Sequence, residues 1–276
     1  MYVRSYSVDK RPASFYFLGL FFVLFTVFLY GPNITIAILS FQGESGGLTF
    51  PMRGVSLHWF GQLFERQAVG DFSSALLRSF ALGLMVMVCT VTFSLLAGLA
   101  FRKRFVGSST VFYLTLTSLI LPSILVSLGI GLMFDRFGFT PNWFSSGFGS
   151  HLTWTLPFGL LIMFAVFNRF NPSYEMASAD LGATTLQTFR FILLPLLAPS
   201  LTGIGLFGFT LSYDEFARTL MTSGSLNTLP LELFAMTTNV TSPVLYALGT
   251  VTTLVSLCVI LLTLVLVKQL RKARTR

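Results

Sequence analysis

Charged residues are scarce in this chain. Asp, Glu, Lys and Arg make up 10% of its 276 residues, whereas hydrophobic residues make up 54% and aromatic residues 15%. A single water-soluble core could not bury so much apolar surface. The scarcity of charge therefore excludes an ordinary soluble protein and predicts a chain that lies in a bilayer.

Cysteine and histidine are scarce as well, with two of each. Cys89 and Cys258 fall in the middle of apolar stretches, where cysteine behaves as a small hydrophobe, and they form no CxxC pair. His58 and His151 are expected near the membrane interfaces, and neither has a second ligand three or four residues away. These absences argue against a disulfide framework, a metal site and the convergent side chains that a membrane enzyme would need.

Six stretches without charged residues are each longer than the roughly 20 residues that a helix needs to cross a bilayer. Small residues are mixed into the apolar ones, which is typical of helices packed in lipid rather than of barrel strands. The sequence therefore predicts an all-α membrane protein with six transmembrane helices. The predicted spans are 14–38, 77–101, 109–133, 151–168, 194–213 and 245–267.

Basic residues indicate how the chain is oriented, because Lys and Arg collect on the cytoplasmic side of membrane proteins. With the N-terminus inside, 13 of the 18 basic residues fall in cytoplasmic segments and 5 in outer ones. Both termini, residues 1–13 and 269–276, are therefore predicted to be cytoplasmic. Residues 14–268 form the six-span core of a single transmembrane domain that covers 1–276.

The basic C-terminal tail and the formal net charge of +8 are interpreted as topology signals. Next to a membrane helix, a run such as Arg271-Lys-Ala-Arg-Thr-Arg276 more often meets anionic lipid than RNA. We therefore expect membrane lipid, and no nucleic acid, as a partner of this tail.

A polar segment between the fourth and fifth predicted spans, residues 169–195, is more organised than a simple loop needs to be. A short helix can form before Gly182, which would stop it because glycine readily takes the left-handed conformation at a helix C-terminus. Thr184 or Thr185 could cap a second helix, which Pro195 would end or kink on entry to the fifth span. The segment therefore predicts a helix-turn-helix elbow in the cytoplasm.

This elbow resembles the coupling loop of the permease subunits of ATP-binding-cassette (ABC) importers. The family signature reads EAA, three residues, G, nine residues, I, one residue, LP. The residues that match it in identity and in spacing are Gly182, Ile192, Leu194 and Pro195. The match is specific because it falls in the expected loop of a chain whose six spans were inferred independently.

The chain departs from the signature at the EAA triplet. Met176 stands where the family usually has glutamate, and Glu175 lies one position earlier. Ala177 fits the triplet, but Ser178 replaces its second alanine. No single carboxylate is therefore assigned to the contact that the family glutamate makes.

The resemblance implies the fold of a type I ABC importer permease, in which the elbow is the coupling helix that docks in a groove of an ATPase subunit. No Walker-type G-x-x-x-x-G-K-[ST] occurs in the chain, so the nucleotide would bind elsewhere. We therefore expect a non-catalytic subunit with no cofactor of its own, and ATP and magnesium on the partner. The residues expected to carry ATPase coupling are Glu175, Ala177, Ser178, Asp180, Leu181, Gly182 and Ala183.

The resemblance also implies the other partners. An ABC ATPase dimer would drive the importer, and a second homologous permease, expected to differ from this one, would complete a heterodimeric pore. A periplasmic substrate-binding protein would deliver the solute. The expected location is the bacterial inner membrane.

Downstream motifs resemble the spermidine/putrescine branch of these permeases. They are Leu211-Ser-Tyr-Asp-Glu-Phe216, Thr222-Ser-Gly224, Thr228-Leu-Pro-Leu-Glu232 and Thr241-Ser-Pro243. Importers of ferric iron, thiamine, opines and aminophosphonates share much of this pattern. The expected solute is a polyamine or a related small cationic or zwitterionic compound.

Four residues are candidates for the solute path, namely Asp214, Glu215, Ser123 and Ser127. The two acids lie at the outer end of the fifth span, where they could attract a cation or form a capped helix end that faces solvent. The serine hydroxyls could line a path or bond to backbone carbonyls within the bundle. The sequence leaves both alternatives open.

A secondary transporter driven by an ion gradient is the alternative function. Such proteins commonly carry buried acids, broken helices and inverted repeats at mid-depth in the membrane. No charged residue lies well inside any predicted span of this chain, which argues against proton or sodium coupling.

Overall fold

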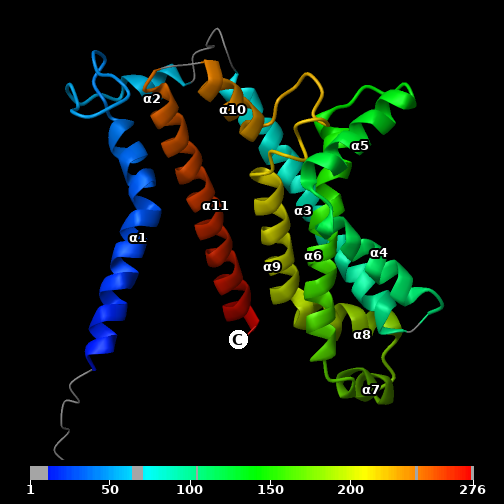
Figure 1. The fold of residues 1–276 in the computed structure, drawn as a ribbon. Helices are drawn as coiled ribbons and strands as arrows, with labels where there is room; N and C mark the ends of the chain where they lie inside the picture. The colour runs from blue at the N-terminus through cyan, green and yellow to red at the C-terminus, as the bar shows by residue number, and fades with distance from the viewer. Residues whose placement is uncertain (1–11, 64–70, 104, 240–241, 275–276) are drawn as a thin grey trace, which may run out of the picture. The chain divides into compact units, whose positions relative to one another are not determined.

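The computed structural model describes residues 12–63, 71–103, 105–239 and 242–274, and these are predominantly helical (Figure 1). Among them, a single antiparallel bridge joins Gln42 and Val55. The helices are α1 (Ala13–Leu39), α2 (His58–Gln62), α3 (Phe72–Arg102), α4 (Ser108–Ile120), α5 (Ser123–Arg136), η1 (Trp143–Gly147), α6 (Phe148–Asn168), α7 (Ser173–Asp180), α8 (Thr185–Thr188), η2 (Phe189–Leu193), α9 (Leu194–Tyr213), α10 (Leu229–Asn239) and α11 (Val244–Arg274), where η marks a π-helical turn.

The chain divides into two compact units, of which the first comprises residues 1–65 and 241–254. Its helix α1 exposes nearly all of its apolar side chains, as expected of a helix surrounded by lipid. The segment after α1 folds around the buried side chain of Gln42, which both donates and accepts a hydrogen bond. At the start of α11, the Tyr246 hydroxyl donates to the Leu48 carbonyl. Polar contacts thus fix the conformation of this connecting segment.

The second unit comprises residues 66–240 and 255–276, and α3, α6 and α9 pack together in it (Figure 1). These helices approach closely at glycines: a Cβ on Gly83 would lie 2.9 Å from the Phe209 ring. Small residues let membrane helices gain van der Waals contact along their backbones. The centre of the packing is a buried cluster of Met163, Leu197, Leu201 and Ile204.

Within the described residues, five helices are long and apolar enough to cross a membrane, or six if the bent pair α4 and α5 is one span. They confirm the all-helical class, although all five begin earlier than predicted. Helix α3 starts at Phe72 rather than at 77, and the helix predicted from 151 starts with η1 at Trp143. Residues 1–11, most of the predicted cytoplasmic N-terminus, lie outside the described residues, and the cytoplasmic location of both termini stays a prediction.

The predicted span over 109–133 is not one straight helix. Helices α4 and α5 meet at an angle of 107°, and Leu121, directly before Pro122, is extended with ψ at 134°. Proline lacks a backbone N–H, and its ring disfavours the helical conformation of the residue before it, so the first helix ends there. The bend directs α5 toward the segment after α9, where the Ser127 hydroxyl accepts a hydrogen bond from the Met221 N–H (3.1 Å).

The close approach of α3 and α6 generates a stability prediction. A Cβ on Gly159 would lie 2.0 Å from Ser94 Oγ and 3.0 Å from Ser94 Cβ. We expect Gly159→Ala to push the two helices apart and to lower the free energy of unfolding by about 1–3 kcal/mol. Thermal unfolding of the purified protein in detergent measures the change. The control is Gly203→Ala in α9, where nothing lies within 4 Å of the added methyl group; equal effects of the two changes would contradict this packing.

Candidate functional site

The elbow between α6 and α9 begins with α7, which ends as the sequence predicts. Gly182 has a positive φ of 75°, its N–H bonds to the Ala179 carbonyl (2.9 Å), and the Ala183 N–H bonds to the Ser178 carbonyl (3.0 Å). These two bonds form a Schellman motif, which requires a left-handed residue and therefore favours glycine. The turn of the elbow is thus specified by one residue.

The second arm of the elbow begins at Thr184, one of the two caps predicted. Its hydroxyl accepts from the Gln187 N–H (3.3 Å), and the Gln187 side-chain oxygen accepts from the Thr184 N–H (2.7 Å), which together make a capping box. Of the two effects predicted for Pro195, ending or kinking this helix, the first does not occur. Helix α8 continues through the π-helical turn η2 into α9, and Pro195 lies in the first turn of α9. The helix departs from regular α geometry in η2, the π-helical turn that ends at Leu193, shortly before Pro195.

Most of the predicted docking residues face away from the chain's own fold. Leu181 is 88% exposed, and Ala177, Asp180 and Gly182 are also exposed, while Ala183 is half-buried. A hollow of about 350 Å³ lies beside the turn, and it is lined by Leu181, Gly182, Ala183, Gln187, Thr188, Phe191 and Ile192. The elbow therefore presents an accessible surface that combines apolar side chains with bare backbone.

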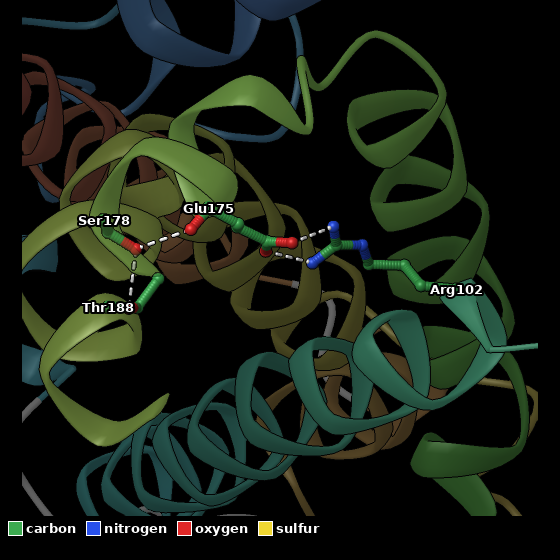
Figure 2. Close-up of polar contacts among 4 residues, drawn as sticks. All are labelled: Arg102, Glu175, Ser178 and Thr188. Atoms are coloured by element: carbon green, nitrogen blue, oxygen red, sulfur yellow. Dashed lines mark hydrogen bonds and ion pairs between the residues drawn. The ribbon is translucent and has the colours of Figure 1, made fainter. Parts of the chain in front are cut away.

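Two of the predicted docking residues face inward (Figure 2). The buried Ser178 hydroxyl donates to the Glu175 carbonyl (2.8 Å) and shares a hydrogen bond with the Thr188 hydroxyl (2.8 Å). The Glu175 carboxylate accepts two hydrogen bonds from the Arg102 guanidinium at the end of α3, with N–O distances of 2.6 and 2.8 Å. Ser178 thus joins α7 to α8, and Glu175 joins α7 to α3.

No local pattern indicates that Arg102 contacts the elbow, because 73 positions separate it from Glu175. Successive residues of an α-helix point about 100° apart. Met176, at the usual position of the family glutamate, is 57% exposed, whereas Glu175 points toward α3. A carboxylate at position 176 would face solvent, whereas the carboxylate at position 175 contacts Arg102 of the same chain.

At the other end of α9, the predicted path residues have different environments. The Glu215 carboxylate accepts a hydrogen bond from the Arg218 N–H (2.9 Å), as the capped helix end among the two alternatives would. The Ser127 hydroxyl accepts a hydrogen bond from the Met221 N–H in the same segment after α9. Asp214 remains accessible and makes no side-chain hydrogen bond with the described residues, and burial of its surroundings raises the pKa of its carboxyl group. Ser123 lies at the start of α5, about one helical turn from Ser127.

His151, which the sequence predicts near a membrane interface, is completely buried within the protein. Its Nδ1 lies 2.7 Å from the Ser212 hydroxyl and its Nε2 lies 2.9 Å from the Thr219 hydroxyl. Both ring nitrogens are therefore engaged in joining α6 to the end of α9 and to the segment that follows it. Among the described residues, no three His, Cys, Asp or Glu side chains are placed to hold a metal ion.

Arg218 is the second buried group that the sequence did not predict, and it is 2% exposed. Its Nη1 donates to the Thr153 hydroxyl (2.6 Å) and its guanidinium carbon lies 5.4 Å from the centre of the Trp154 ring. Burial lowers the pKa of its guanidinium group, and the nearby Glu215 carboxylate opposes that shift. Together, His151 and Arg218 fix the segment after α9 to α6.

Comparison with known proteins finds polyamine permeases among the sequence relatives, although no protein-family model matches the chain. The chain is 28% identical over 266 residues to a spermidine/putrescine transport system permease protein PotC homolog of Mycoplasma pneumoniae, which covers 91% of each chain. It is 26% identical over 263 residues to PotC of Escherichia coli K12, covering 93% of this chain and 96% of the relative. It is also 27% identical over 235 residues to the putrescine permease PotI of the same organism, covering 81% and 80%.

Solved structures with the same fold include chains of ABC transporters. A chain of a bacterial importer of the acidic polysaccharide alginate matches with a TM-score of 0.73 at 15% identity, covering 92% of this chain and 94% of that one. A chain of the MetNI methionine transporter in an inward-facing conformation matches with a TM-score of 0.53 at 15% identity, covering 71% and 96%. The predicted fold of an ABC importer permease is thus confirmed.

The buried histidine generates a second stability prediction. We expect His151→Ala to lower the free energy of unfolding by about 1–3 kcal/mol, because buried hydroxyls of Ser212 and Thr219 lose their partner. Thermal unfolding in detergent measures the loss. The control is His58→Ala, whose ring lies 3.5 Å from the exposed Glu44 and whose replacement should change stability by less than about 0.5 kcal/mol. A loss for His151→Ala no larger than that would contradict a structural role for the ring.

Proposed function

We propose that this permease subunit of an ABC importer forms half of a pore for a polyamine or a related small cation and is driven through its elbow by a separate ATPase dimer. The observation that carries the proposal is the preformed turn at Gly182, which exposes Leu181 beside a hollow of about 350 Å³. Nothing in the packing of the described residues requires an exposed leucine there. A partner that covers this surface would remove it from water.

The remaining partners follow from the same proposal. An ATPase dimer that binds ATP and magnesium would bind the elbow of this chain and the elbow of a second, different permease. Closure of the dimer would then move both elbows. A periplasmic binding protein would deliver the solute to the opposite side. This arrangement requires the elbow, and with it both termini, to lie on the cytoplasmic side of a bacterial inner membrane.

Polyamine transport is supported by the names of the sequence relatives and by Asp214. The relatives are described as spermidine/putrescine and putrescine permeases. Asp214 offers an accessible carboxylate at the end of α9 without a hydrogen-bonding partner among the described residues. A carboxylate in partly buried surroundings attracts a cation more strongly than one in bulk water. Glu215, by contrast, would act indirectly, by shaping the turn that carries Asp214.

The elbow generates the decisive test of ATPase coupling. In proteoliposomes that contain the complete importer, we expect Gly182→Asp to insert normally but to lower spermidine uptake per ATP hydrolysed by about tenfold. The added carboxylate would protrude into the docking surface, and coupling between two sites is typically about 1–3 kcal/mol. Uptake and phosphate release are measured on the same vesicles.

Gly107→Asp is the matched control for that variant. Gly107 also has a positive φ (84°), and like Gly182 it has no atom within 4 Å of an added Cβ, but it lies outside the elbow. Its variant should therefore couple normally. Normal coupling by Gly182→Asp, or uptake driven by an ion gradient in vesicles without the ATPase, would contradict the proposal.

The raised pKa of Asp214 generates a prediction about pH. Acidification should protonate its carboxyl group at a higher pH than that of an exposed aspartate, so spermidine uptake should fall in that range. Asp214→Asn should remove this step and raise the KM for spermidine by about tenfold, equivalent to about 1.4 kcal/mol of lost charge attraction. Asp135→Asn, at the exposed end of α5, is the control. An unchanged KM and pH profile in the Asp214 variant would exclude this carboxylate from the solute path.

A further inference from the structure

The elbow has an inward link to α3 that is separate from its outward surface (Figure 2). We propose that Arg102 and Glu175 are a positioning pair, which passes the movement of the elbow to α3 and through α3 to the segment around Asn227 and Leu229. This role rests on the proposed function, since a partner ATPase must move the elbow. The pair itself touches neither the nucleotide nor the solute.

The pair can transmit movement because its geometry is bidentate. Arg102 Nη1 lies 2.6 Å from Glu175 Oε1, and Nη2 lies 2.8 Å from Oε2. The two side chains are only 25% and 30% exposed. Two parallel hydrogen bonds fix the orientation of the partners as well as their distance. A rotation or shift of α7 must therefore either break both bonds or displace the end of α3.

Arg102 is itself held by aromatic rings. Its guanidinium carbon lies 5.0 Å from the centre of the Phe167 ring and 5.4 Å from that of Phe170, within the range of cation–π attraction. One turn earlier on α3, a Cβ on Gly98 would lie 2.8 Å from the Phe167 ring, so the helices are in close contact at this point. The arginine is therefore a fixed end of α3 rather than a freely moving side chain.

Among the described residues, no other hydrogen bond or ion pair joins the elbow to α3. Along the chain, the elbow connects to α6 before it and to α9 after it. In the parts of the chain that the structure describes, the Arg102–Glu175 pair is the only hydrogen-bonded or ionic link between α3 and α7. Ser178 and Thr188 join the two arms of the elbow, so the arms move together. Without the pair, α3 would follow the elbow only through side-chain packing.

The opposite end of α3 is fastened to the segment that leads into α10. Arg78 Nε donates to the Asn227 carbonyl (2.6 Å), and the Ser79 hydroxyl accepts from the Leu229 N–H (2.7 Å). Helix α3 has 31 residues and is therefore about 46 Å long, enough to cross the bilayer. A helix tied at both ends can move as one body. Displacement of its elbow end thus changes the position of the segment that follows Asp214 in the chain.

Charge exchange tests the pair in the complete importer, reconstituted in proteoliposomes with radiolabelled spermidine as the probe. Arg102→Glu and Glu175→Arg each place like charges opposite one another. We expect each to lower spermidine uptake per ATP hydrolysed by about fivefold or more. The double variant, in which the charges are exchanged, should recover to within about twofold of the unaltered importer, because the two changes are coupled.

Lys103→Glu is the matched control, because it makes the same change of charge one residue away. Lys103 is exposed, and its side chain makes no hydrogen bond or ion pair with the described residues. Its variant should therefore keep the normal ratio of uptake to hydrolysis. The amount of ATPase that co-purifies with each permease variant is measured in parallel, since a purely structural role would lower assembly without changing the ratio.

The outcomes separate this role from the proposed function. If the unaltered importer shows no ATP-dependent spermidine uptake, both are overturned. If it transports, and Gly182→Asp uncouples it while both single charge variants keep the normal ratio, only the positioning role is overturned. A double variant whose uptake per ATP is as low as that of the single variants also overturns the positioning role. A normal ratio in the double variant, with low ratios in both single variants, supports it.

Discussion

Every buried backbone N–H and C=O in a membrane-spanning chain must find a partner within the protein, because the hydrocarbon offers none. In the spans of this chain the α-helix meets most of that requirement by itself. The segment between α9 and α10 is not a continuous helix, and side chains of its neighbours supply the partners instead. Ser146 donates to the Thr222 carbonyl (2.7 Å), and Ser150 donates to the Arg218 carbonyl (3.1 Å). These two serines therefore hold an irregular segment in place, and their hydroxyl groups are not free to contact a solute.

The need to pair backbone N–H and C=O groups also explains why the elbow has one face toward the bundle and one toward solvent. Its turn satisfies its own backbone through Gly182 and the Thr184 capping box, so its inward side chains are free to bond to the bundle. Ser178 and Glu175 do so, and the apolar Leu181 remains on the outside. An element that were held only by a partner would need no such inward contacts. One that served only the chain's own fold would not need the exposed leucine.

The parts of this structure that the sequence predicts are those with a local cause. Absence of charge over about 20 residues predicts a span, and a glycine followed by a threonine cap predicts the elbow. The bend at Pro122 is also local, but a proline within a span is compatible with a kinked helix as well as a broken one. The burial of His151 and the Arg102–Glu175 pair depend on residues 61 to 73 positions apart. Hydropathy and spacing carry no record of such contacts, so only the fold reveals them.

The distribution of charge along α3 bears on how energy enters the bundle. Arg78 lies near one end of the helix and Arg102 at the other, and residues 79–101 contain no charged side chain. Transport driven by an ion gradient commonly relies on ionisable groups at mid-depth, where binding or release of an ion changes the packing. In α3 that region is apolar or carries hydroxyl groups such as that of Thr90, which donates to Thr155 (3.0 Å). Under the proposed function this helix would instead be moved from its ends, and the end that carries the bidentate ion pair is the one at the elbow.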